Sequence, residues 1–243
     1  MEGTLSSAPL AGQPGELGEP LDFHPPRSLD RAPLRGRLVN LVPVDPARDA
    51  ERLFAVSHPP AGDPAIWTYM FDGPYEDVAA LRAALERSAT SEDPFFYTVL
   101  REPEGDPQGI VSFLRITPEH GVIEIGNIWF GVPLQRTAAS TEVIYLLARH
   151  AFDELGYRRL EWKCNALNQA SRRAAERFGF AFEGVFEQHM VVKGRSRDTA
   201  WYAITDRRWP PVRSAFAAWL SPDNFDAGGH QRRSLASLRE AGA

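Results

Sequence analysis

The 243-residue sequence contains a single cysteine, Cys164, so it can form no internal disulfide and no zinc cluster built on cysteines. This sparing use of cysteine is typical of a reducing compartment, and we expect a cytoplasmic protein. Cys164 itself lies on an expected core strand, where burial is a better interpretation than nucleophilic chemistry. None of the six histidines has metal-ligand spacing to a cysteine or an aspartate, so no metal is expected.

Long apolar runs are also missing. No stretch reaches the ~18 apolar residues of a membrane span, and the first residues lack the basic and apolar regions of a signal peptide. The formal charge of −5 gives no general attraction to nucleic acid or acidic membranes. Neither a G-x-x-x-x-G-K-[ST] loop nor a G-x-G-x-x-G loop occurs, which disfavours nucleoside triphosphates and dinucleotides as ligands. We therefore expect no membrane partner, and nucleic acid is the least favoured partner.

The composition is that of an ordinary globular protein, with 43% hydrophobic residues. Residues 1–34 are rich in proline and glycine and poor in periodic apolar content, which predicts an extended, partly disordered arm. Residues 35–206 carry the alternating patterns of one α+β domain with a mixed sheet. Residues 207–243 offer two helices, which we expect to pack on that domain as a C-terminal extension.

The centre of the chain predicts a strand–helix–strand crossover. A strand at Val122–Phe130 leads into an amphipathic helix from Ala138 to Gly156, and a second strand follows at Arg159–Asn165. Gly156 stands where a left-handed helix cap is expected. The helix start brings unpaired amides and the positive end of the dipole to Gln135–Thr141, a favourable place for an anion.

Other patterns place the remaining elements around this crossover. Turn-rich residues between two alternating segments predict a hairpin, and a Lys-Gly turn predicts another near the end of the sheet. The expected strands are Leu38–Val44, Phe95–Leu100, Gln108–Ile116, Phe182–Val192 and Thr199–Thr205; the expected helices are Pro46–Val56, Tyr75–Thr90, Ala170–Arg177, Pro211–Leu220 and Gln231–Ala241.

Several motifs in this order resemble the GNAT superfamily of acyl-CoA-dependent N-acetyltransferases, and most closely its RimJ/RimL-like branch. They are Glu124-Ile-Gly126 with Trp129, Gln135-x-x-Ala138-x-Ser140-Thr-Glu142, Asn168-x-x-Ser171 and the pair Gly179-Phe180. The resemblance covers about residues 37–206. It implies a central mixed, twisted sheet flanked by helices, in which two neighbouring parallel strands splay apart. It also implies transfer of an acetyl group from acetyl-CoA to a primary amine by direct attack on the thioester.

The resemblance further implies where the cofactor binds. The amides of Ile128, Trp129 and Phe130 would contact the acetyl and pantetheine groups, and those of Arg136 to Thr141 would hold the pyrophosphate. Arg136 replaces a common glycine, which is tolerable if its φ is negative. The full implied set is Ile128, Trp129, Phe130, Gln135, Arg136, Thr137, Ala138, Ala139, Ser140, Thr141, Asn168 and Ser171.

The reaction needs a base, because an amine is mostly protonated at neutral pH. We assign this role to Glu124, acting directly or through water; the competing interpretation is an exposed strand glutamate without a role. Met190 stands where the RimL enzymes carry a glutamate. Ser171 matches a family position that donates a proton to the departing thiolate, although it could equally cap a helix.

The acceptor side of the family corresponds to the aromatic segment Trp67, Tyr69, Phe71 and Tyr75, with His189 as a further candidate. These aromatic residues could equally be core residues. A pocket walled by them would suit a protein N-terminus, an amino acid or peptide-like compound, or another small amine. A non-catalytic acyl-CoA-binding module remains an alternative, and the sequence leaves open whether the protein is a homodimer.

Overall fold

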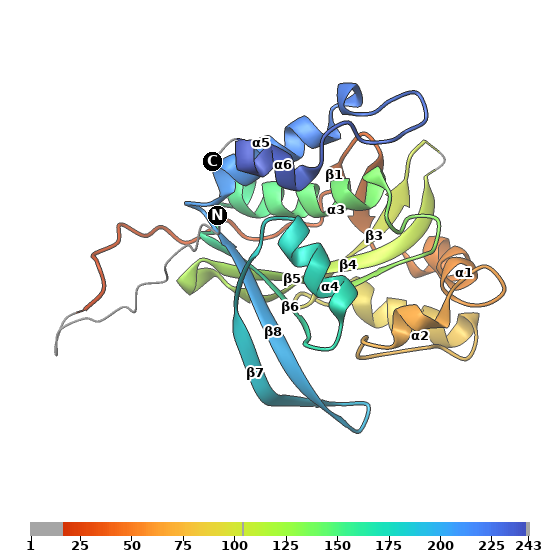
Figure 1. Ribbon diagram of the computed structural model, residues 1–243. Coiled ribbons are helices and arrows are strands. Elements are labelled where there is room, and N and C mark those ends of the chain that lie inside the picture. The colour runs from red at the N-terminus through yellow and green to blue at the C-terminus, as the bar shows by residue number, and fades with distance from the viewer. Residues whose placement is uncertain (1–16, 104, 242–243) are drawn as a thin grey trace.

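The computed structural model describes residues 17–103 and 105–241 and shows one eight-stranded sheet (Figure 1). The strands follow the order β1-β2-β3-β4-β5-β6-β8-β7 across the sheet, and β5 and β6 are parallel while the other neighbours are antiparallel. Their bounds are β1 Leu34–Arg35, β2 Val39–Pro43, β3 Phe95–Arg101, β4 Asp106–Thr117, β5 Val122–Phe130, β6 Arg159–Asn165, β7 Ala181–Val192 and β8 Arg195–Thr205. The predicted mixed sheet is confirmed.

Helices cover both faces of this sheet. The α-helices are α1 Pro46–Ser57, α2 Val78–Thr90, α3 Ala138–Arg149, α4 Gln169–Arg177, α5 Trp209–Leu220 and α6 Leu235–Ala241. Short helical turns occur at η1 Pro64–Trp67, η2 Pro118–His120, η3 His150–Leu155 and η4 Pro222–Asn224. Figure 1 shows α3 below α5 and α6, with α1 and α2 together at another part of the molecule. The larger apolar core contains side chains of α3 and α5, and a smaller core contains side chains of α1 and α2.

The central crossover forms as predicted because its sequence signals agree with its packing. Thr137 is the N-cap of α3, and its hydroxyl oxygen accepts from the amide of Ser140 at 3.2 Å. The helix ends through a π-helical turn at Gly156, whose φ of 84° is the left-handed cap conformation. The strands β5 and β6 have the bounds predicted for them.

The parallel pair β5 and β6 separates part of the way along. Their register runs from Val122 opposite Arg159 to Ile125 opposite Trp162. Beyond this point β5 continues to Phe130 and β6 to Asn165 without further pairing to each other. The unpaired halves diverge, so the sheet opens between them on the side where α3 begins.

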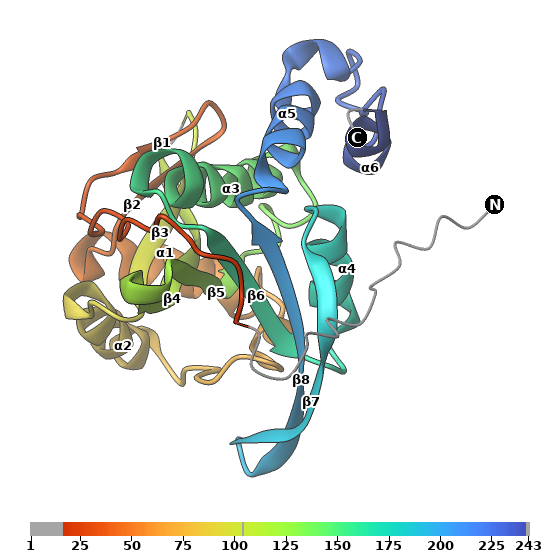
Figure 2. The same ribbon diagram turned by 90° about the vertical axis from the view of Figure 1, so that its left-hand side faces the viewer.

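The last two strands form a long hairpin that extends beyond the rest of the sheet (Figure 2). Register shifts between Phe182 and Gly184 and between Phe186 and Met190 interrupt their pairing. The hairpin turn reaches back to the loop before α2, because the ammonium of Lys193 donates to the carbonyls of Trp67 at 2.9 Å and Gly73 at 2.6 Å. This contact fixes the hairpin turn against the aromatic segment.

The first and last described segments were predicted as appendages of the domain. Half of the predicted arm, residues 1–16, lies outside the described residues, and residues 17–33 contain no regular element. At the other end, α5 packs on α3 with the rings of Tyr145 and Phe216 stacked at 5.6 Å. The predicted last helix begins at Leu235 rather than at Gln231. Over the described ranges, we find no helix with the length and apolarity needed to cross a bilayer.

Candidate active site

A cleft of about 1370 Å³ occupies the opening between β5 and β6. Its walls combine the end of β5, the start of α3, one face of α4 and the segment after α5. Every residue implied as a cofactor contact lines it except Ala139, whose side chain lies in the core. The lining members of that set are Ile128, Trp129, Phe130, Gln135, Arg136, Thr137, Ala138, Ser140, Thr141, Asn168 and Ser171.

The start of α3 leaves main-chain donors at one end of this cleft. The amides of residues 136–139 make no hydrogen bond within the described part of the chain, whereas Ser140 donates to its N-cap. Free amides at a helix start, combined with the helix dipole, favour an anion. The condition of a negative φ at Arg136 is not met, since its φ is 59°. Arg136 therefore adopts the left-handed conformation that the family glycine would adopt without strain.

Three parts of the cleft wall were not predicted from the sequence. They are Arg37, Arg177 and the C-terminal extension. Arg177 donates to the hydroxyl of Thr141 at 3.1 Å and lies 4.9 Å above the ring of Trp219. Burial, together with the charge of Arg239, lowers the pKa of Arg177. No described carboxylate forms an ion pair with it.

A helical spacing on α4 could have revealed Arg177. Ser171, Ala174 and Arg177 recur at three-residue steps and all line the cleft. Nothing comparable marks Trp219, Phe225 or Gln231, because these residues reach the cleft only through the packing of α5 against α3.

Ser171 has a hydroxyl that contacts both Trp162 and Cys164. The indole of Trp162 donates to Ser171 Oγ at 2.9 Å, so the O–H is left to act as a donor, and the thiol of Cys164 lies within its reach. The amide of Ser171 donates to the side chain of Asn168, which is the N-cap of α4. The capping role thus belongs to Asn168, and Ser171 lines the cleft.

A second cavity, of about 370 Å³, adjoins the cleft and shares several wall residues with it. The shared residues are Ile66, Ile128, Gln135, Trp162, Asn168, Ala170 and Ser171. The remaining wall includes Tyr69, Phe71, Arg115, Glu124, Lys163, Cys164 and Arg197. A group in the cleft and a group in this second cavity can therefore meet beside Ser171. We call the second space the acceptor cavity, because Tyr69 and Phe71 of its wall belong to the segment that the resemblance places on the acceptor side.

Glu124 lies on the wall of the acceptor cavity but is not the exposed strand glutamate of the competing interpretation. The residue is 2% exposed. Arg115 Nη1 contacts both carboxylate oxygens at 2.8 Å, and Lys163 Nζ lies 2.9 Å from one of them. Lys163 in turn contacts Glu161 at 2.6 Å. The negative charge of Glu124 is therefore matched by cations on two neighbouring strands.

The aromatic segment divides between the core and the acceptor cavity. Trp67 is 2% exposed and packs against Trp129 at 5.2 Å and edge-on to Tyr75 at 5.3 Å, so it is a core residue. Burial raises the pKa of Tyr75, which lines a neighbouring cavity of about 350 Å³. Tyr69 and Phe71 keep substantial exposure and line the acceptor cavity.

His189 and Cys164 occupy different positions relative to the two cavities. His189 lines neither of them; its ring nitrogen lies 3.0 Å from the hydroxyl of Thr199, and its ring lies 6.0 Å from that of Trp201. Cys164 lines the acceptor cavity, where burial raises the pKa of its thiol. No cluster of three or more potential metal ligands occurs within residues 17–103 and 105–241.

Comparison with known proteins gives consistent matches. A family described as "Acetyltransferase (GNAT) domain" matches residues 38–181. A solved GCN5-related N-acetyltransferase from Brucella melitensis is 42% identical, covers 90% of this chain and 99% of its own, and has a TM-score of 0.87. A structure from Chromobacterium violaceum ATCC 12472, titled a probable acetyltransferase of the GNAT family, is 37% identical over 82% of this chain and 99% of its own, with a TM-score of 0.73.

A curated relative from Bacillus subtilis (strain 168) carries the name "Putative ribosomal N-acetyltransferase YdaF". It is 27% identical over 106 residues, which are 44% of this chain. The match spans 57% of the relative's own length.

Proposed function

Since the chain belongs to the acetyltransferase (GNAT) domain family and is an N-acetyltransferase, we propose that it transfers the acetyl group of acetyl-CoA to a primary amine. The acceptor is a small molecule or the N-terminus of a peptide or protein, and the amine attacks the thioester directly. The observation that carries this proposal is the continuity of two cavities at Ser171: a large cleft ending at free helix amides, and a smaller one walled by Glu124.

The cleft fits a long ligand with phosphates at one end. Residues 136–139 present free amides, and Arg177 adds a half-buried cation that no described carboxylate neutralises. The opening between β5 and β6 exposes the edge of β5, so the amides of Ile128 to Phe130 can hold a pantetheine arm as a neighbouring strand would. Bound there, acetyl-CoA supplies an activated carbonyl. A main-chain N–H at its oxygen would stabilise the charge that develops during attack.

Ser171 and Glu124 are the groups we propose for proton transfer. The hydroxyl of Ser171 can donate to the departing sulfur because the indole of Trp162 occupies its oxygen. Only modest donation is needed, since a thiol has a pKa near ~8.5. Glu124 is the carboxylate on the acceptor-cavity wall, and we propose that it receives the amine's proton directly or through a water. His189 and Tyr75 line neither the cleft nor the acceptor cavity, so we propose no direct contact between them and the acceptor.

Acetyl-CoA binding tests the cofactor part of this proposal. At one hundred times its dissociation constant, acetyl-CoA should add about 2.7 kcal/mol to the free energy of unfolding. Ala138→Asp should abolish this gain with little loss of stability, because a carboxylate favours a helix start but repels phosphate. A melting curve of the wild type that a millimolar excess leaves unchanged would show that the cleft has another ligand.

Turnover tests the reaction itself. Free CoA thiol should appear when acetyl-CoA is mixed with a reactive amine, and an N-acetylated product of matching amount should be found by mass spectrometry. The protein's only thiol, Cys164, is buried, so it adds little background to such an assay. Thiol release without acetylated amine would mean hydrolysis and would contradict amine transfer.

A further inference from the structure

Arg197, on β8, is a buried arginine in the acceptor cavity that has no counter-ion. The residue is 7% exposed, and it lines the cavity together with Phe71 and Ser171. Within the described residues its guanidinium forms no ion pair or hydrogen bond, and its Nε is buried without a partner. Its one close neighbour of note is the ring of Phe71, 5.1 Å from the guanidinium carbon.

The charges around Arg197 are already matched with one another. Arg115 and Lys163 contact Glu124, Lys163 and Arg159 contact Glu161, and Arg159 contacts Glu183. Three cations and three carboxylates thus form one network of ion pairs. Arg197 takes no part in this network. Burial lowers its pKa, which reflects the cost of holding a charge away from water. Removing a guanidinium from water without a partner is expensive, and a bidentate anion would offset this cost.

We propose that the acceptor amine carries a carboxylate and that Arg197 binds it. The inference rests on the proposed acetyl transfer and narrows its substrate to small amino acids and compounds like them. The cavity of about 370 Å³ is in the range of small-ligand sites. With its carboxylate at Arg197, such an acceptor has Tyr69 and Phe71 beside its apolar part and Ser171 at the border with the cofactor cleft.

The proposal makes Arg197 a substrate-binding residue rather than a structural one. The structural alternative is that the cation–π contact with Phe71 alone explains the position of Arg197. The two roles differ in one measurable respect. A structural arginine affects all acceptors alike, whereas a carboxylate-binding arginine affects the preference between acceptors with and without that group.

The experiment compares matched acceptors with acetyl-CoA saturating. L-Phenylalanine and L-leucine are measured against their amides and against 2-phenylethylamine and 3-methylbutylamine, with each rate divided by the unprotonated fraction of its amine. The amino acids should be favoured in kcat/KM by about 10- to 100-fold, the range of a charge-assisted hydrogen bond. Arg197→Met should bring this ratio close to one, and Arg197→Lys should leave an intermediate ratio because it keeps the charge but loses the bidentate fork.

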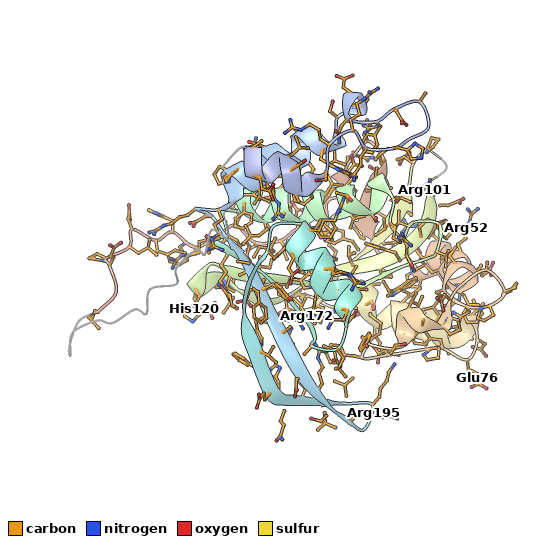
Figure 3. The ribbon with its side chains drawn as sticks, viewed as in Figure 1. Arg52, Glu76, Arg101, His120, Arg172 and Arg195 are labelled. Atoms are coloured by element: carbon orange, nitrogen blue, oxygen red, sulfur yellow. The ribbon has the colours of Figure 1, made fainter. Side chains whose placement is uncertain are left out.

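Arg195→Met is the matched control, because it removes the same charge from an exposed position on the same strand. Figure 3 labels Arg195 near the turn of the β7–β8 hairpin. This variant should keep the wild-type ratio. The thermal shift with acetyl-CoA reports on the fold of every variant independently of the acceptor.

Amides or decarboxylated amines that react as well as the amino acids would overturn the substrate class and leave the acetyltransferase intact. If Arg197→Met lowers kcat/KM equally for acceptors with and without a carboxylate, the proposed substrate class is also wrong. Turnover with none of the panel would also overturn it, and the acetyl-CoA thermal shift then decides whether the cofactor assignment fails as well.

Discussion

The carboxylate of Glu124 is held from two sides, by Arg115 of β4 and Lys163 of β6. Both partners belong to strands adjacent to β5, so the contacts depend on sheet order rather than on local sequence. They fix the carboxylate on the acceptor-cavity wall. They also mean that removing its charge leaves Arg115 and the buried Lys163 with fewer partners.

Glu124→Gln should therefore affect both rate and stability. Loss of a general base lowers turnover by about 100- to 10,000-fold, with a smaller loss at high pH where free amine is abundant. Breaking a buried ion pair on one side costs about 3 kcal/mol. The double variant Glu124→Gln with Lys163→Met restores the charge balance and should recover stability without recovering turnover. Rates from pH 6 to 9 on an active amine check this, and a rate unchanged by Glu124→Gln would place the base elsewhere.

Arg136 carries a backbone cost that a glycine would remove. Its φ of 59° lies in the left-handed region, which costs a residue with a Cβ about 1–2 kcal/mol. We expect Arg136→Gly to be more stable than Arg136→Ala by about 1 kcal/mol, since both lose the charge and only one loses the strain. Urea denaturation of the two variants gives the difference. Alanine equal to glycine would mean that the loop relaxes without cost.

At the scale of elements, α4 presents one face to the large cleft. Asn168 caps the helix, and Ser171, Ala174 and Arg177 follow along the lining face. The positions of Asn168 and Ser171 on the cleft wall were predictable from the motif Asn168-x-x-Ser171. Arg177 ends the same face, and its guanidinium reaches Thr141 of α3 across the cleft.

Arg177→Met should weaken acetyl-CoA binding by about 10- to 100-fold, the effect of losing a charge-assisted contact to a phosphate. Arg173→Met is its control, because Arg173 is exposed on the same helix and does not line the cleft. Titration calorimetry with acetyl-CoA measures both. Equal affinities for the two variants would remove Arg177 from the cofactor site.

The crossover elements were predictable because local signals and packing agree there. The apolar spacing of the long helix, its glycine cap and the flanking strands all recur in the structure with the predicted bounds. The family motif also located the part of the cleft wall formed by the end of β5, the start of α3 and the start of α4. The ion pairs of Glu124, the solitary Arg197 and the wall formed by Trp219 were beyond prediction, since each depends on which distant strands and helices become neighbours.

The whole molecule buries several groups that ionise at alkaline pH. Burial raises the pKa of Cys164 and of Tyr75, Tyr97, Tyr157 and Tyr202. Each group therefore favours the folded state while it is neutral. Their contribution is complete below the ordinary pKa values of 9.0 and 10.0, and it is lost as the pH rises toward the higher folded values.

We accordingly expect the free energy of unfolding to fall steadily from about pH 9 upward, as the unfolded state releases protons that the folded state retains. Urea denaturation followed by circular dichroism between pH 7 and pH 11 measures this dependence. Tyr97→Phe should weaken the dependence of the unfolding free energy on pH, because it removes a buried hydroxyl whose pKa is raised in the folded state. A stability that stays constant to pH 11 would contradict the assigned burial of these groups.

The walls of the large cleft include Arg37 near one end of the described chain and Gln231 near the other. During synthesis on the ribosome, the β5–α3–β6 crossover is complete long before α5 and the segment after it have emerged. An incomplete chain can thus present the free amides at the start of α3 but not the wall around Trp219. Full affinity for a ligand of this cleft should arise only after Gln231 has emerged, so ligand binding would report that the elements from Arg37 to Gln231 have assembled.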